Sequence, residues 1–167
     1  MHGDVNLMTS FAKSCNASFA NIGMSMDREK FGETIDGLLF NQELSFPLPY
    51  NQTKVTLDQD STDEDVIQTS IGQGKTQITP VQLNLITAAI ANGGKAAVPR
   101  LIEKSTTDYG LPTGIYRTKN SAQLIDEKTA GTIADLMHNN VIETYGQDRL
   151  PGHGHLREVG HRRGRRG

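Results

Sequence analysis

The spacing of apolar residues predicts two helices in the first forty residues. From residue 4 to residue 24, large apolar side chains recur at helical intervals: Leu7, Met8, Phe11, Cys15, Phe19 and Ile22. Asp4 or Asn6 supplies the cap. The stretch Ser14-Cys15-Asn16 predicts an interruption, because Ser and Asn side chains compete for backbone hydrogen bonds. A second helix is predicted over residues 27–40, with Asp27 near its start.

Residues 45–65 predict a long irregular loop, because they are polar, contain two prolines and end in acidic residues. The acidic cluster comprises Asp58, Asp60, Asp63, Glu64 and Asp65. It lacks the glycine and the spacing of a calcium-binding EF-hand loop. We therefore expect the cluster to belong to the solvated loop.

The clearest helix signal follows Thr79. Thr79 is a good cap, Pro80 suits the first helical position, and Gly93-Gly94 ends the pattern. Its apolar residues leave little polar surface, which predicts a largely buried helix: Val81, Leu83, Leu85, Ile86, Ala88, Ala89 and Ile90.

The second half of the chain alternates between strand and helix signals. Residues 96–105 predict a strand with Pro99 at an edge or entry position, and residues 106–120 are turn-rich with room for a short strand. A long helix is predicted from about residue 126 to residue 145, with one apolar face formed by Ile133, Leu136, Met137 and Val141. This mixture predicts an α+β or mixed α/β architecture.

Charge divides the chain into an acidic body and a basic tail. The net charge of −2 over 167 residues arises from −6 in residues 1–152 and +4 in residues 153–167. The acidic body is poorly suited to nucleic acid, since such binding depends on neutralising phosphates. A single cysteine excludes an internal disulfide framework or a Cys-rich zinc site. The sequence "HGDVN" after Met1 predicts no signal peptide, and no apolar run is long enough to span a bilayer.

Two short motifs and one histidine have simple interpretations when taken alone. The stretch "GQGKT", which begins at Gly72, has Thr69 where a phosphate-binding loop needs glycine, so its glycines predict a tight turn with positive φ. Ser10 to Lys13 matches the S-x-x-K pattern of penicillin-recognising serine enzymes, but two fixed residues in four carry little information. His138 is expected to be an exposed or half-buried helix residue.

Longer segments of the sequence, taken together, indicate a family more specifically than these short motifs do. The segments "HGDVNLMTSFAKSCNASFANIG" and "SIGQGKTQITPVQLNLITAAIANGGKAAVPRLIEK", followed by a long helix ending in "YG", resemble the transpeptidase domain of class B penicillin-binding proteins. The resemblance covers nearly all of residues 1–152. It implies a partial penicillin-binding transpeptidase fold, which is of the α+β, serine β-lactamase-like type.

The resemblance also assigns roles to site residues. The family's S-x-N motif falls on Ser14, Cys15 and Asn16, which implies that Ser14 relays a proton and Asn16 holds the substrate. Cys15 is expected to pack between helices. Gly72, Gln73 and Gly74 match the family's G-Q-G turn, whose role near the site we expect to be structural.

Two family motifs are missing. The acylated serine belongs to an S-x-x-K motif on a separate helix upstream of S-x-N, so it would precede Met1, and the match at Ser10 is a coincidence. The third motif, K-[ST]-G-T, should follow Gly146 but is absent. We therefore expect a truncated domain over residues 1–152 and no acylation of this chain.

The tail "HGHLREVGHRRGRRG" (residues 153–167) admits three interpretations. It could be a basic arm for nucleic acid or a membrane surface, or a metal tract using His153, His155 and His161. The third is a shifted reading frame. One nucleotide later, codons for residues 158–164 can spell Lys-Ser-Gly-Thr-Ala-Glu, which is the missing motif. We favour the shifted frame.

The resemblance implies an activity for the parent protein. It forms a serine acyl-enzyme with a D-Ala-D-Ala stem peptide, cross-links peptidoglycan and reacts with β-lactams, without a metal or an organic cofactor. The expected partners are peptidoglycan stem peptides and a cell-wall synthesis complex, not nucleic acid. The parent is expected to be held in the bacterial cell membrane by an upstream anchor, with this domain outside the cytoplasm. The alternative is a non-catalytic penicillin-recognising sensor or scaffold.

Overall fold

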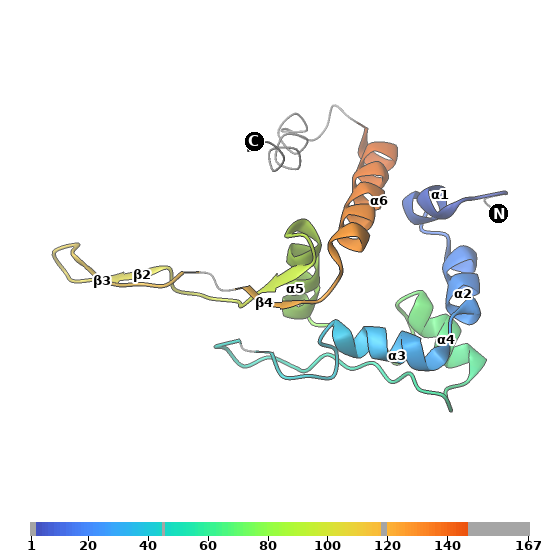
Figure 1. The fold of residues 1–167 in the computed structure, drawn as a ribbon, viewed down its shortest axis with the longest axis horizontal. Coiled ribbons are helices and arrows are strands. Elements are labelled where there is room, and N and C mark those ends of the chain that lie inside the picture. Colours follow the sequence, from blue (N-terminus) through green and yellow to red (C-terminus); the bar gives the residue numbers. More distant parts are fainter. Residues whose placement is uncertain (1–2, 45, 118–119, 147–167) are drawn as a thin grey trace, which may run out of the picture. The chain divides into compact units, whose positions relative to one another are not determined.

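A computed structural model describes residues 3–44, 46–117 and 120–146. Within these ranges, helices predominate over a few short strands (Figure 1), which agrees with the predicted partial α+β fold. The helices are α1 (Leu7–Ala12), α2 (Asn16–Ser25), α3 (Arg28–Gly37), α4 (Asp63–Ser70), α5 (Pro80–Ala91) and α6 (Glu127–Tyr145). The strands are β1 (Lys95–Ala97), β2 (Lys104–Thr106), β3 (Pro112–Ile115) and β4 (Asn120–Gln123).

The chain divides into two compact units. Among the described residues, the first comprises 3–15 and 135–146, and the second comprises the described part of 16–134. The boundary falls between α1 and α2 and again inside α6.

The predicted break between the first two helices is confirmed. Asn6 caps α1: its side chain accepts a hydrogen bond from the Thr9 N–H at 2.9 Å, and the Thr9 hydroxyl accepts one from the Asn6 N–H at 3.0 Å. The helix ends at Ala12, and Ser14 adopts a φ of 48°, a left-handed conformation that no continuous helix contains.

Helix α3 begins where expected but ends early. The Asp27 carboxylate accepts a hydrogen bond from the Lys30 N–H at 3.0 Å. The helix stops at Gly37 rather than residue 40, because Leu39 and Asn41 have φ values of 64° and 57°. The Asn41 amide then exchanges two hydrogen bonds with the backbone of Val55, at 2.8 and 2.9 Å, which fastens the following loop to this turn.

The predicted loop is real but shorter than expected. It is irregular from Phe46 to Thr62, apart from a bridge between Lys54 and Gln77. The prediction that the last acidic residues belong to the loop is wrong, since residues 63–65 form the first turn of α4. Negative charge stabilises the amino end of a helix, and Thr62 and Asp65 form a capping box there.

Helix α5 has the predicted ends but not the predicted burial. Thr79 caps its start. Gly93 and Gly94 follow its end with φ values of 62° and 85°. Only one face is buried, at Gln82, Leu85 and Ala89, whereas Leu83 is 53% exposed. Leu85 on that face forms a small core with Leu44 and Ala96, and Leu39, Phe46, Tyr50, Val81 and Leu124 pack around it.

The single strand predicted over residues 96–105 is wrong. Two separate strands, β1 and β2, flank an irregular segment that contains Pro99, which has no N–H to donate to a ladder. β1 pairs antiparallel with β4, which the sequence did not indicate, while β2 and β3 form a separate antiparallel hairpin. β3 is the short strand expected within residues 106–120.

Helix α6 is confirmed almost residue for residue. It begins after Asp126, whose carboxylate accepts a hydrogen bond from the Thr129 N–H at 2.9 Å. The Thr129 hydroxyl and, after it, this backbone hydrogen bond lower the pKa of Asp126. His138 is exposed, as predicted.

Candidate functional site

Ser14 lies in the exposed break that follows α1. Its N–H donates a hydrogen bond to the Phe11 carbonyl at 3.2 Å, and its φ of 48° is uncommon for a residue with a side chain. The next N–H, that of Cys15, donates to the Ser10 carbonyl at 2.9 Å. Cys15 is buried, with 8% of its surface exposed, whereas Ser14 is exposed. The tight turn therefore buries Cys15, as expected of a packing residue, and leaves Ser14 open to solvent.

Asn16 is the first residue of α2 and is exposed. It belongs to the second unit and Ser14 to the first, so each is placed only within its own unit. Helix α2 lies tightly against α4 at Gly23: a Cβ there would stand 1.8 Å from the Ser70 Oγ and 2.7 Å from the Ser70 Cβ. Only glycine permits this approach. The Gly23–Ser70 contact thus fixes the helix that carries Asn16 against α4.

The carboxyl end of α4, where Ser70 lies, leads into the G-Q-G turn. Gly72 and Gly74 both have φ of 70°, which confirms the predicted positive-φ turn. The Gly72 N–H donates to the Thr69 carbonyl at 3.0 Å, and the Gln73 N–H donates to the Gln68 carbonyl at 2.8 Å. The turn follows the carboxyl end of a helix, whereas a phosphate-binding loop leads into an amino end. The geometry therefore agrees with a structural turn.

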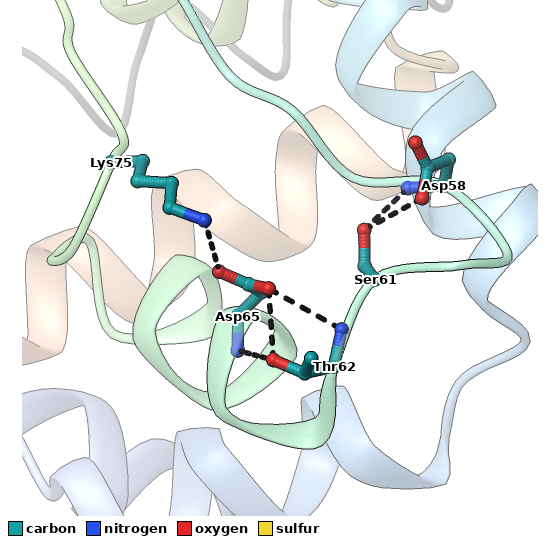
Figure 2. Close-up of polar contacts among 5 residues, drawn as sticks. All are labelled: Asp58, Ser61, Thr62, Asp65 and Lys75. Carbon is teal, nitrogen blue, oxygen red and sulfur yellow. Dashed lines mark hydrogen bonds and ion pairs between the residues drawn. The ribbon is translucent and has the colours of Figure 1, made fainter.

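A polar clasp holds this turn to the first turn of α4 (Figure 2). The Lys75 ammonium donates to Asp65 Oδ1 at 3.1 Å, and the Thr62 hydroxyl donates to Asp65 Oδ2 at 2.8 Å. The Thr62 hydrogen bond, and after it the Lys75 contact, lowers the pKa of Asp65. Beside it, the Ser61 hydroxyl donates to the Asp58 carboxylate at 2.9 Å. The Asp65 carboxylate is therefore ionised at neutral pH. It accepts structural hydrogen bonds and does not act as an acid.

The acidic residues of the clasp were predicted to lie in a loop, although the sequence contains a signal for the clasp. Thr62-x-x-Asp65 is the pattern of a capping box, and it stands directly before the apolar residues of α4. A polar hollow of about 460 Å³ opens beside the clasp, lined by Thr56, Thr62, Glu64, Asp65, Gln68, Thr69, Gly74, Lys75 and Thr76.

Two further features considered in the sequence are a metal-binding site and a membrane-spanning segment. Across residues 3–44, 46–117 and 120–146, no group of three or more His, Cys, Asp or Glu side chains is placed to hold a metal ion. His153, His155 and His161 lie outside the described residues. Among the helices of the described ranges, none is both long and apolar enough to cross a bilayer.

Solved structures of known proteins share the fold of this chain. A crystal structure of PBPA from Mycobacterium tuberculosis matches with a TM-score of 0.76 at 23% identity, over 85% of this chain and 34% of that one. Its imipenem acyl-enzyme complex matches with a TM-score of 0.79 at 22% identity, over 90% and 35%. These likenesses show that the fold is that of penicillin-binding transpeptidases.

The family is shown by the sequence itself. The family model of the penicillin binding protein transpeptidase domain matches residues 1–156, so the chain belongs to that family. It is 28% identical to "Peptidoglycan D,D-transpeptidase PbpA" of Mycolicibacterium smegmatis, over 80% of this chain and 27% of the relative. It is 23% identical to "Penicillin-binding protein 3" of Bacillus subtilis, over 78% and 20%. The chain thus spans about a fifth to a quarter of the length of these curated relatives.

Proposed function

We propose that this chain is part of a peptidoglycan D,D-transpeptidase that cross-links stem peptides through a serine acyl-enzyme and reacts with β-lactams. The observation that carries the proposal is the family match over residues 1–156, with an S-x-N motif at Ser14 to Asn16. The name of the mycobacterial relative and the imipenem acyl-enzyme of a structural neighbour support it. Because its substrate is cell-wall peptide, the parent acts outside the cytoplasm, held at the membrane and working within a cell-wall synthesis complex.

Ser14 and Asn16 are the proposed site residues of this chain. The Ser14 hydroxyl relays the proton that leaves the nucleophile, since a hydroxyl beside a lysine can both accept and donate one. The Asn16 amide holds the peptide group of the substrate, because an amide offers a donor and an acceptor together. Both residues are exposed at the turn that separates α1 from α2, which supports these roles. Gly72 and Gly74 shape the turn after α4 and take no part in the chemistry.

The 167-residue chain does not itself form the acyl-enzyme. Its one S-x-x-K match, Ser10 to Lys13, directly adjoins the S-x-N motif instead of lying on a separate helix. Ser10 is only 2% exposed, so its hydroxyl is inaccessible to a substrate carbonyl. Burial supports the interpretation that this match is a coincidence.

The tail is proposed to result from a shifted reading frame. The family match stops at residue 156, and the codons of residues 158–164 are compatible with Lys-Ser-Gly-Thr-Ala-Glu in the shifted frame. The nucleotide sequence that encodes residues 146–167 tests this directly. We expect the shifted frame to encode Lys, then Ser or Thr, then Gly, and a shifted frame without this motif would overturn the proposal.

The site roles are tested by labelling with a fluorescent penicillin. The protein used is the one expressed from the frame-restored coding region with its flanks. Asn16→Ala should slow labelling strongly, whereas Asn21→Ala, which replaces another exposed asparagine of α2, should not. Ser14→Ala should also slow labelling, because the proton that leaves the nucleophile loses its relay. Equal rates for Asn16→Ala and Asn21→Ala would overturn the role of Asn16.

A further inference from the structure

Asn92 and Gly93 form the turn between α5 and β1. They are the one Asn-Gly pair in the sequence. Asn92 ends the helix with φ −102° and ψ 31°, and Gly93 follows in the left-handed region with φ 62°. Asn92 is exposed, and Gly93 is half-buried. The turn therefore places an asparagine amide at the surface, next to a backbone nitrogen that carries no side chain to shield it.

The surroundings of the pair leave room for a reaction between them. A Cβ built on Gly93 would find its nearest neighbour, the Glu127 Cγ, at 3.8 Å, which is ordinary contact. The Asn92 Nδ2 donates a hydrogen bond to the Lys95 carbonyl at 3.0 Å, and both of these residues are exposed. Gly93 therefore offers a backbone nitrogen with no side chain between it and the Asn92 amide carbon.

We propose that Asn92-Gly93 is a site of spontaneous deamidation in the folded protein. The Gly93 nitrogen forms a bond to the Asn92 Cγ, and the bond from Cγ to Nδ2 breaks. The Nδ2 group leaves as ammonia, taking the proton that the Gly93 nitrogen loses. Water then opens the resulting five-membered imide at either carbonyl. The product carries aspartate or, with one extra carbon in the main chain, isoaspartate.

The modification loosens the junction of α5, β1 and β4, because the backbone of this turn is closely packed against its neighbours. A Cβ on Gly94 would stand 1.7 Å from the Ile125 carbonyl oxygen, so the backbone passes there at the closest distance. The Gly94 carbonyl accepts hydrogen bonds from the Leu124 and Ile125 N–H groups at 2.9 and 3.2 Å. An extra main-chain carbon cannot be inserted at residue 92 without moving these groups apart.

The charge change acts in the same direction. Either product replaces the neutral amide, which donates to the Lys95 carbonyl, with a carboxylate that cannot donate. A negative charge at the carboxyl end of α5 also opposes the helix dipole. The modified chain should therefore lose order in β1 and β4 while the rest of the unit stays folded. This inference is independent of the proposed transpeptidase function.

The test is a time course on the unmodified 167-residue chain at mildly alkaline pH. Trypsin releases residues 76–95 as one peptide, which also contains exposed Asn84 followed by Leu85. We expect the amide-to-acid mass shift at Asn92 and none at Asn84, with isoaspartate detected by a protein isoaspartyl methyltransferase. Hydrogen exchange should quicken at the Leu124 and Ile125 amides in the modified fraction. Asn92→Gln should remove the methyltransferase signal from the peptide of residues 76–95.

A parallel sample in urea provides the comparison that can overturn the proposal. If Asn92 keeps its amide in the folded chain while the unfolded chain deamidates, then the turn protects the pair and the proposal is wrong. If Asn92 is modified but exchange at Leu124 and Ile125 is unchanged, the proposed loosening of β4 is wrong.

Discussion

The contact between α2 and α4 makes a specific prediction about stability. Replacing Gly23 with alanine adds a methyl group 1.8 Å from the Ser70 Oγ and 2.7 Å from the Ser70 Cβ. Neither distance is tolerable, so one helix must move away from the other. Since α2 begins at Asn16, the substitution should disturb the site helix as well as the packing.

The magnitude follows from two opposing terms. Forcing an extra methyl group into a packed contact costs about 1–3 kcal/mol. Alanine instead of glycine within a helix returns about 0.5–1 kcal/mol. The free energy of unfolding of Gly23→Ala should therefore fall by about 0–2.5 kcal/mol, with a central value of about 1 kcal/mol. At Gly37, the last residue of α3, an added Cβ meets nothing within 4 Å, so Gly37→Ala should be neutral or slightly stabilising.

Urea unfolding followed by circular dichroism measures both variants. The midpoint should drop for Gly23→Ala with the slope unchanged, because the amount of surface exposed on unfolding stays the same. Ser70→Gly removes both clashing atoms, so the double variant should recover part of the loss, as an interaction energy in a double-mutant cycle. Equal midpoints for Gly23→Ala and Gly37→Ala would refute the tight contact.

Further predictions concern the clasp and the core. Thr62→Ala removes the cap of α4 and should cost about 1 kcal/mol. Because hydrogen bonds lower the pKa of Asp65 in the folded state, its contribution to stability is present above the unfolded pKa and is lost as pH falls through the folded pKa. Acid titration of urea midpoints should show this loss in the parent chain, and a smaller one in Thr62→Ala. Leu85→Ala should cost about 2–5 kcal/mol, whereas Leu83→Ala, 53% exposed on the same helix, should cost less than about 0.5 kcal/mol; similar costs would contradict the one-sided burial of α5.

Helix starts were predictable because they depend on local chemistry. Asn6, Asp27 and Thr79 each accept a hydrogen bond from an N–H three residues later, and that pattern is visible in the sequence. The start of α4 was equally visible in Thr62-x-x-Asp65, but the surrounding acidic residues favoured the loop interpretation.

Burial and strand pairing depend on partners that are distant along the chain. The apolar residues of α5 do not reveal which side faces the core, so the exposure of Leu83 was not predictable. β1 is defined by its pairing with β4, some 25 residues later, and each strand is only three or four residues long. Such short segments carry too little alternation to be detected locally.

The site was predictable only in part. The positive φ of Gly72 and Gly74 follows from glycine spacing before a helix, whereas the roles of Ser14 and Asn16 rest on resemblance to a family. The left-handed backbone of Ser14 had no signal beyond its polar neighbours.

The central claim is that this chain is part of a serine transpeptidase whose nucleophile lies outside these 167 residues. Fluorescent penicillin labelling tests it most directly, applied to the 167-residue chain and to the protein expressed from the frame-restored coding region with its flanks. We expect no covalent adduct on the short chain. On the restored protein, we expect an adduct that maps to a serine of an S-x-x-K motif upstream of Ser14. An adduct on the short chain, or none on the restored protein, would contradict the claim.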